Sequence, residues 1–244
     1  FLSRVAPTNL PSARYLGKAN WTSPNGDLYL FGGASFGGSL NDMWKYDITS
    51  NQWTWIAGSN NTSAVVSYGI KGLPASTNDP GARYQCTSNW VADNKLWLIG
   101  GRRGIGDQGN DLWSYDLLTN LWTWESGSQA ISPNGNYGQK GTSNNTNEPP
   151  GRGYPTTWKG FDGALYMFGG AKGPSNFNDV WKYNNTINQW TWESGSSILN
   201  NAGKDGGACS TDATHAPYAR YETGVGLTNH TCSRAKYFFG GFSI

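Results

Sequence analysis

The sequence predicts an all-β fold that is built from a repeated unit. Three segments recur in a fixed order: an apolar run that ends in Gly-Gly, an Asn-Asp-x-Trp-x-Tyr segment and a Trp-Thr-Trp segment. The tryptophans at the centre of the unit, Trp44, Trp113 and Trp181, lie 69 and 68 residues apart, and a fourth copy begins at Tyr237. In the first copy the segments are Leu28–Gly33, Asn41–Tyr46 and Trp53–Trp55. An internal period of this kind indicates a repeat architecture.

The composition agrees with many short strands that are joined by turns. The 244 residues include 34 Gly and 13 Trp, and only 14% of them are charged. This length suits one large all-β domain whose packing is aromatic. The net charge of +2 and the lack of a Lys/Arg run argue against nucleic-acid binding. No apolar run approaches the ~20 residues that cross a bilayer, so we expect no membrane span in this chain.

Each unit is expected to begin at an arginine. These arginines are Arg14, Arg83, Arg152 and Arg220, and Pro or Gly residues that break secondary structure precede the last three. We therefore predict complete units over residues 14–58, 83–127 and 152–195, and a half unit over residues 219–244, all within one domain over residues 1–244.

Four strands are predicted in each complete unit. In the first unit, the first strand runs from Arg14 to about Trp21, and the hairpin turn Pro24–Asp27 follows it. The Leu/Tyr/Phe run after this turn predicts a second strand that is buried on both faces. The Asp-x-Trp-x-Tyr alternation, with Trp44 and Tyr46 on one face, predicts the third strand. Trp-Thr-Trp is the fourth.

Long loops join the units, over residues 57–82, 126–151 and 194–219. Connections of about two dozen residues inside a compact domain are usually functional. The first two loops share a Tyr-Gly-x-Lys-Gly segment, and the third keeps a Gly-Lys-Asp-Gly remnant. We therefore expect ordered loops that project from one face and contact a partner. The candidate interaction residues are Tyr68, Lys71, Tyr137, Lys140 and Lys204.

An aspartate also repeats at the start of every predicted third strand, as Asp42, Asp111 and Asp179. Its recurrence in every unit indicates a structural task. We expect each aspartate to hold a turn or to pair with the arginine that opens its unit.

These repeats resemble the kelch repeat, and three full copies with one half copy cover nearly the whole chain. The resemblance implies a kelch-type β-propeller with three complete four-stranded blades and a half blade, of the non-enzymatic type within the galactose-oxidase-like superfamily. It also implies that each Gly-Gly pair turns the second strand out of its blade at positive φ. The aromatics implied to pack blade against blade are Tyr46 with Trp53, Tyr115 with Trp122, and Tyr183 with Trp190.

Two departures from the family pattern concern length. The period of 68 to 69 residues exceeds the ~50 that is typical of kelch units. Three and a half blades also do not close a ring of about 4–8 blades. We therefore expect an excerpt of a longer chain, with the alternative that another subunit completes the ring. Residue 1 is Phe, which fits an excerpt or the removal of a leader.

Enzymatic activity is not expected. The copper enzyme galactose oxidase shares the kelch-type fold, and a site of that type uses two imidazoles and a tyrosine cross-linked to a cysteine. His215 and His230 lie in different segments, and neither neighbours a Tyr-Cys arrangement. No paired catalytic carboxylates stand out. We therefore expect no catalytic residue, no cofactor and no metal site.

Cysteines and glycosylation sequons bear on the compartment. The cysteines Cys86, Cys209 and Cys232 match no zinc or redox spacing, so they are buried thiols or include one disulfide made in an oxidising compartment. Asn-x-Ser/Thr sequons occur at Asn20, Asn60, Asn61, Asn144, Asn184 and Asn229. In a secreted protein, we expect glycans at Asn60 or Asn61, at Asn144 and at Asn184.

Three functions remain open. The first is an extracellular or cell-surface structural or protein-interaction module, within a glycosylated assembly, whose partners are proteins or copies of itself. Unpaired strand edges would favour the self-assembly. The second is a carbohydrate-binding propeller with glycan partners, in which aromatic rings stack on sugars. The third is a fragment of an oxidase whose site lies outside this chain.

Overall fold

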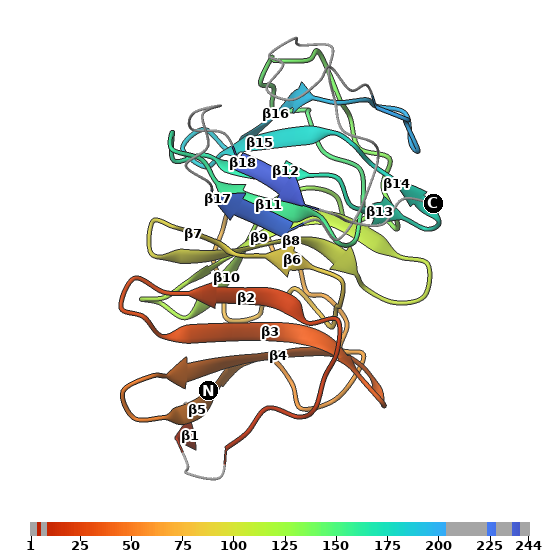
Figure 1. The fold of residues 1–244 in the computed structure, drawn as a ribbon. Coiled ribbons are helices and arrows are strands. Elements are labelled where there is room, and N and C mark those ends of the chain that lie inside the picture. Colours follow the sequence, from red (N-terminus) through yellow and green to blue (C-terminus); the bar gives the residue numbers. More distant parts are fainter. Residues whose placement is uncertain (1–3, 6–8, 204–223, 228–235, 240–244) are drawn as a thin grey trace. The chain divides into compact units, whose positions relative to one another are not determined.

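The chain folds into a series of antiparallel β-sheets. The computed structural model describes residues 4–5, 9–203, 224–227 and 236–239. These residues contain no helix, and their strands include three four-stranded blades (Figure 1). The chain divides into two compact units, residues 1–133 and 134–244, and each is described by itself. The predicted all-β fold with four-stranded blades is confirmed.

The first unit contains two blades, each a meander of antiparallel strands. Blade 1 consists of β2 (Lys18–Thr22), β3 (Leu28–Ser35), β4 (Gly38–Asp47) and β5 (Gln52–Ala57). Blade 2 consists of β7 (Trp90–Ala92), β8 (Lys95–Arg102), β9 (Gln108–Asp116) and β10 (Leu121–Ser126). Two short strands extend blade 1 at its edges (Figure 1): β1 (Arg4–Val5) beside β5, and β6 (Thr87–Ser88) parallel to β2.

The second unit contains blade 3 and two small sheets. Blade 3 consists of β11 (Thr156–Lys159), β12 (Leu165–Phe168), β15 (Val180–Asn184) and β16 (Gln189–Ser194). The hairpin between β12 and β15 carries β13 (Ala171–Lys172) and β14 (Ser175–Asn176). A two-stranded sheet of β17 (Gly224–Leu227) and β18 (Lys236–Phe239) lies within the residues predicted as a half unit.

The first strand of each blade begins later than predicted. In blade 1 it begins at Lys18 rather than at Arg14, in blade 2 at Trp90 rather than at Arg83, and in blade 3 at Thr156 rather than at Arg152. The reason is a residue with positive φ two positions after each arginine: Leu16, Gln85 and Tyr154, with φ of 54°, 59° and 55°. A left-handed residue bends the chain, so a continuous strand cannot start before it.

The Gly-Gly pairs have the positive φ that the family resemblance implied. The first glycine of the pair, Gly32, Gly100 or Gly169, has a φ of 65°, 57° or 63°. A side chain at Gly32 would also place its Cβ 2.7 Å from the carbonyl oxygen of Arg83. In blades 1 and 2 the ladder between the second and third strands shifts register at this pair. Glycine is therefore required both by the backbone conformation and by the space.

The turn between the third and fourth strands repeats one hydrogen-bonding pattern. Asp47 Oδ1 accepts hydrogen bonds from the backbone N–H groups of Thr49 and Ser50, both at 2.9 Å. Asn51 then adopts a φ of 55°, and its side chain accepts a hydrogen bond from the hydroxyl of Tyr46. Asp and Asn favour this turn because their short side chains bond the neighbouring backbone and tolerate the left-handed region.

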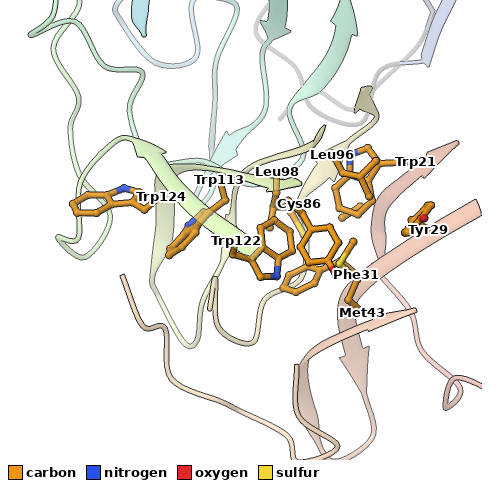
Figure 2. Packing of buried hydrophobic residues seen from close by; sticks show 12 residues of the cluster. Trp21, Tyr29, Phe31, Met43, Cys86, Leu96, Leu98, Trp113, Trp122 and Trp124 are labelled. Atoms are coloured by element: carbon orange, nitrogen blue, oxygen red, sulfur yellow. The ribbon is translucent and has the colours of Figure 1, made fainter. Parts of the chain in front are cut away.

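The core of the first unit joins blades 1 and 2 (Figure 2). Phe31 of β3 meets Trp122 of β10 edge to face, with ring centroids 5.3 Å apart. Trp21 of β2 donates its indole N–H to the carbonyl oxygen of Trp97 at 3.1 Å. The implied pairs, such as Tyr115 with Trp122 at 5.1 Å, do form. They lie across neighbouring strands of one blade, and Trp122 also packs against the other blade.

The outer edge of each blade is covered, and the expectation of unpaired edges is wrong for these strands. The carbonyl oxygen of Trp124 on β10 accepts the N–H of Gly72 at 2.8 Å, and Ala75 bridges Trp122. The loop over residues 134–151 covers β16 in the same way, and β1 pairs with Thr54 and Trp55 of β5. A covered edge offers no ladder for another copy to extend.

Candidate interaction site: anchored loops and hairpin tips

An arginine–aspartate ion pair locks the start of the third strand in every blade. Nitrogen–oxygen distances are 2.7 Å for Arg14–Asp42, 2.9 Å for Arg83–Asp111 and 2.6 Å for Arg152–Asp179. The same guanidinium donates a hydrogen bond to the carbonyl oxygen of the first glycine in the Gly-Gly pair. The predicted pairing of the repeated aspartate with the opening arginine is confirmed.

Burial sets the electrostatics of these pairs. Burial by itself would raise the pKa of Asp111, but the charges of Arg83 and Arg103 reverse this effect and hold the pKa below its ordinary value. Arg152 is fully buried, and the charge of Asp179 raises its pKa despite the cost of burial. Asp111 and Arg152 therefore remain charged at neutral pH, which is what a fixed structural clamp requires.

A tyrosine from the preceding loop completes the site in blades 2 and 3. Tyr68 lies between Trp113 and Trp124, with ring centroids 5.4 and 4.8 Å away, and its hydroxyl donates to Asp111 at 3.2 Å. Tyr137 lies between Trp181 and Trp192 and donates to Asp179 at 2.7 Å. Burial and the neighbouring aspartate raise the pKa of both tyrosines, so their hydroxyls stay protonated.

A lysine three residues later fastens the same loop. Lys71 Nζ donates to the carbonyl oxygen of Gly127 at 2.8 Å and lies 4.4 Å from the centroid of the Trp124 ring. Lys140 Nζ donates to the carbonyl oxygen of Gly195 at 2.8 Å and lies 4.3 Å from the Trp192 ring. An ammonium group over an indole face is attracted by the ring's electron density.

Asparagine side chains tie the loops to the outer strands. Asn78 Nδ2 donates to the carbonyl oxygens of Leu73 and Trp122, both at 2.9 Å. Asn147 Nδ2 likewise donates to the carbonyl oxygens of Thr142 and Trp190, at 2.9 and 3.1 Å. The loops over residues 57–82 and 126–151 are therefore ordered, but they fold back over the following blade rather than project from one face.

The described loop residues that were predicted to bind a partner instead hold their own loops against the following blade. Tyr68, Lys71, Tyr137 and Lys140 each contact the blade that follows their loop, and Lys204 lies outside the described residues. Their role in binding stays a prediction. Their role in holding the loops is a finding of the structure.

Exposed apolar residues at the hairpin tips were missed by the sequence reasoning. Phe36, between β3 and β4, and Ile105, between β8 and β9, have relative exposures of 110% and 102%. Val65 and Ile131, near the starts of the two loops, are also exposed. The available signal was a bulky apolar residue among glycines in a turn, at Gly37-Gly38 and at Gly104 and Gly106.

The loop starts are fastened to these tips. Ser63 donates its backbone N–H to the carbonyl oxygen of Ser39 at 2.7 Å, beside the β3–β4 tip. Ser132 Oγ donates to the carbonyl oxygen of Gly106 at 2.8 Å, beside Ile105. In an antiparallel meander, the connections alternate between the two ends of the blade. Both tips therefore lie at the end opposite the turns that hold Ile48 and Leu118 (Figure 1).

The sequons differ in how they are presented. Asn20, Asn60, Asn61 and Asn144 are exposed, and Asn184 is half-buried. Asn184 occupies the turn position of Asp47, where its Oδ1 accepts the N–H of Thr186 at 2.9 Å. Asn229 lies outside the described residues.

Cys86 is a free thiol with 0% exposure in the core of the first unit. Burial raises its pKa to about 11. The structure therefore gives no support for a disulfide at Cys86. The other candidates, Cys209 and Cys232, lie outside the described residues, as do His215 and His230.

The described ranges hold neither a cluster suited to a metal ion nor a helix suited to a membrane. Residues 4–5, 9–203, 224–227 and 236–239 hold no cluster of three or more His, Cys, Asp or Glu side chains able to bind a metal ion. Over the same ranges, no helix has the length and apolar character to cross a membrane.

Comparison with family models agrees with the repeat geometry. Kelch motif models match residues 19–60, 90–123 and 154–197. These matches fall on blade 1, blade 2 and blade 3, in that order. A comparison with curated proteins gave no match. With the Gly-Gly turn, the Trp-x-Tyr strand and the four-stranded blade present in all three places, the chain belongs to the kelch-repeat family.

Proposed function

We propose that this chain is an extracellular or cell-surface protein-interaction module that binds a protein partner through the hairpin tips of its first unit. Kelch repeats commonly mediate protein–protein interaction, and kelch domains are generally scaffolds without enzymatic activity. The observation that carries the proposal is the exposure of Phe36 and Ile105 at matching tips of consecutive blades, together with the exposure of Val65 and Ile131 in the loops that are bonded to these tips. Exposed apolar patches mark interaction sites, and aromatic residues are enriched at the cores of protein–protein interfaces.

The anchored loops support this proposal. The start of each loop is bonded to a tip, and its middle is held by Tyr68 or Tyr137 on the following blade. Pre-organisation of this kind lowers the conformational entropy that binding would otherwise cost. The loops therefore contribute by fixing the surface, even though their repeated Tyr and Lys residues contact the following blade.

The proposal includes an oxidising, extracellular setting with N-linked glycans. Asn60 and Asn61 are exposed and adjoin Thr62, which lies against the β3–β4 tip at Gly38. A glycan there would border the tip surface. Because Cys86 is a free thiol, Cys209 and Cys232 remain as the candidate disulfide pair. Expression in a secreting eukaryotic cell, followed by enzymatic removal of N-glycans and mass spectrometry of the peptides, tests occupancy at each sequon.

The other hypotheses have less support. Many of the repeated tryptophans are packed against tyrosines within their blades, which removes those ring faces from sugar stacking. The oxidase hypothesis concerns residues outside this chain. Self-assembly by strand addition has less support at the outer strands, because the preceding loops and β1 already pair with them.

The experiment compares two doubly substituted proteins. Phe36→Ser with Ile105→Ser changes the tips, and Ile48→Ser with Leu118→Ser changes exposed residues at the opposite ends of the same blades. Each protein, displayed on beads, is cross-linked to the surface of cultured cells, and the captured proteins are identified by mass spectrometry. We expect a reproducible partner with the wild type and the second protein, and its loss with the first. Equal capture by both variants would contradict the proposal.

A further inference from the structure

One position directly follows the Gly-Gly pair of each blade. Its residue is joined to the residue after the opening arginine by two backbone hydrogen bonds of 2.7–3.1 Å. The joined pairs are Ala34 with Tyr15, Arg102 with Tyr84, and Ala171 with Gly153. Ala34 and Ala171 are buried, each with 6% exposure. The three blades therefore share this backbone position, and blade 2 carries an arginine where blades 1 and 3 carry alanine.

The side chain of Arg102 is held at the base of the β8–β9 tip. Its Nε donates to the carbonyl oxygen of Gly104 at 3.1 Å, and its guanidinium carbon lies 5.9 Å from the centroid of the Tyr84 ring. Arg102 and Tyr84 are both half-buried. Ile105, which is fully exposed, directly follows Gly104 in the same tip. The hairpin therefore fixes a planar cation next to an apolar side chain that stands in solvent.

The positive charge of Arg102 has no counter-ion in the described part of the chain. No carboxylate there lies within ion-pair distance of it, and its Nη1 and Nη2 atoms donate no hydrogen bond to the described residues. The aspartates near the tip are engaged by other arginines. Asp107 accepts from Arg103 with both carboxylate oxygens, at 3.1 Å each, and Asp111 is paired with Arg83 at 2.9 Å. The charge of Arg102 is therefore left unbalanced.

The chemistry of a guanidinium group indicates what it would bind. Its N–H groups form a rigid planar fork that matches the two oxygens of a carboxylate, and such charge-assisted hydrogen bonds are stronger than neutral ones. Because Gly104 and Tyr84 already hold Arg102, binding would cost little additional side-chain freedom. Arginine and aromatic residues are also enriched at protein–protein interfaces. The complement of this tip is therefore a carboxylate next to an apolar group.

We propose that Arg102 binds an aspartate or glutamate side chain of the protein partner, and that an apolar residue adjacent to it packs on Ile105. This inference rests on the proposed function and names the chemistry of the partner segment. The carboxylate balances the charge of Arg102, and the apolar neighbour removes Ile105 from water. The charge recognition belongs to blade 2, because the alanines at the same position in blades 1 and 3 have no group that could provide it.

The test selects peptides from a random library of short sequences displayed on phage, with the whole chain over residues 1–244 as the immobilised target. We expect the selected peptides to be enriched in Asp or Glu next to Leu, Ile, Val or Phe. The same selection is made on two variants. Arg102→Ala should lose the acidic enrichment, and Arg102→Glu should select Lys or Arg in its place, because the sign of the charge is reversed.

Matched controls accompany the selection. Arg102→Ala should fold, since alanine occupies the same position in two other blades. Lys159→Ala removes one exposed positive charge from the second unit and should leave the selection unchanged. By calorimetric titration, the strongest peptide should bind Arg102→Ala about tenfold more weakly than the wild type. Replacement of the peptide's acidic residue by its amide should weaken binding to the wild type similarly and leave binding to Arg102→Ala unchanged.

Three results would overturn the inference: a selection without acidic preference, an acidic preference that survives in Arg102→Ala, or displacement of the peptide by an equal concentration of inorganic phosphate, which would mark a site for free anions. The capture experiment with the Phe36 and Ile105 variant judges the proposed function separately. Capture that depends on these two tips, with peptides that ignore Arg102, would leave the proposed function standing without this inference.

Discussion

Blades 1 and 2 have the same strand register and the same hydrogen bonds to their tryptophans, yet they bury these groups to different depths. The Arg83–Asp111 pair is fully buried, whereas the Arg14–Asp42 pair keeps 8% of each side chain exposed. The difference comes from the segment before the blade, because Tyr68 and Lys71 close over blade 2 and the described residues offer blade 1 only β1. In this architecture, a repeat is therefore completed by chain that precedes it.

The largest expected difference between the blades comes from removing the aspartate. Asp111→Ala should lower the free energy of unfolding by about 3–5 kcal/mol, because it leaves the buried charge of Arg83 without a partner. Asp42→Ala should cost about half as much, since water reaches Arg14. Urea unfolding followed by fluorescence measures both. Equal losses in the two blades would show that the depth of burial does not decide the effect.

Removal of the tyrosine that closes blade 2 should have the next largest effect. Tyr68→Ala deletes a ring packed between Trp113 and Trp124, and we expect a loss of about 2–3 kcal/mol. Tyr15→Ala is the control, since that ring is 60% exposed, and it should change stability by less than about 0.5 kcal/mol. The same unfolding measurement applies. If the two variants melted alike, Tyr68 would not be a closing residue.

The lysine anchors should have a smaller effect. Lys71→Met keeps most of the side chain's bulk but loses the hydrogen bond to Gly127 and the cation–π contact with the Trp124 ring. We expect it to lower the free energy of unfolding by about 1 kcal/mol. Lys140→Met should cost the same in the second unit, because the two geometries agree. Lys159→Met, at an exposed lysine, serves as the control. A loss at only one anchor would break the equivalence of the two loops.

The smallest change in stability is expected on acidification, because protonation of Asp111 destabilises the fold whereas protonation of Asp79 stabilises it. The pKa of Asp111 is lowered in the folded protein, so its stabilisation is present above the unfolded value of 3.8 and is lost as pH falls below it. Burial raises the pKa of Asp79, despite hydrogen bonds from Gly81 and Asn41, so its protonation on acidification favours the folded state. Asp79→Asn should therefore make stability fall more steeply between about pH 5 and pH 2, whereas Asp111→Asn should flatten the fall.

Thermal melts across this pH range check the sign of each change. A flatter profile for Asp79→Asn would contradict the assignment of its pKa, and an unchanged profile for Asp111→Asn would contradict the role of the buried pair.

Much of the blade could be predicted from the sequence because its determinants are local. Gly32 needs a backbone that only glycine adopts easily, and Asn51 forms a turn with its own neighbours. The repeated Asp111 likewise predicted an ion pair. The positive φ of Leu16 carried no such signal, since leucine rarely adopts it, and so the start of β2 was placed too early.

The site was harder to predict because repetition does not distinguish packing from binding. Tyr68 and Lys71 recur in the second loop, which drew attention to them as binding residues, but they recur because blades 2 and 3 need the same closure. Phe36 and Ile105 lie at equivalent tips but are different residue types, so the repeat pattern does not mark them. Their exposure became visible only with the strands in place.

The covering of each outer strand by the preceding loop has a consequence for synthesis. The outer strand is the last strand of its blade to leave the ribosome, and the residues that cover it, such as Gly72 and Ala75 for β10, have left it some 50 residues earlier. When an outer strand is made, the loop that covers it has therefore already been synthesised. The strand can pair with this loop at once, instead of staying exposed to other nascent chains. A fragment cut for expression should accordingly keep a blade with the loop before it, such as residues 59–127, rather than with the loop after it.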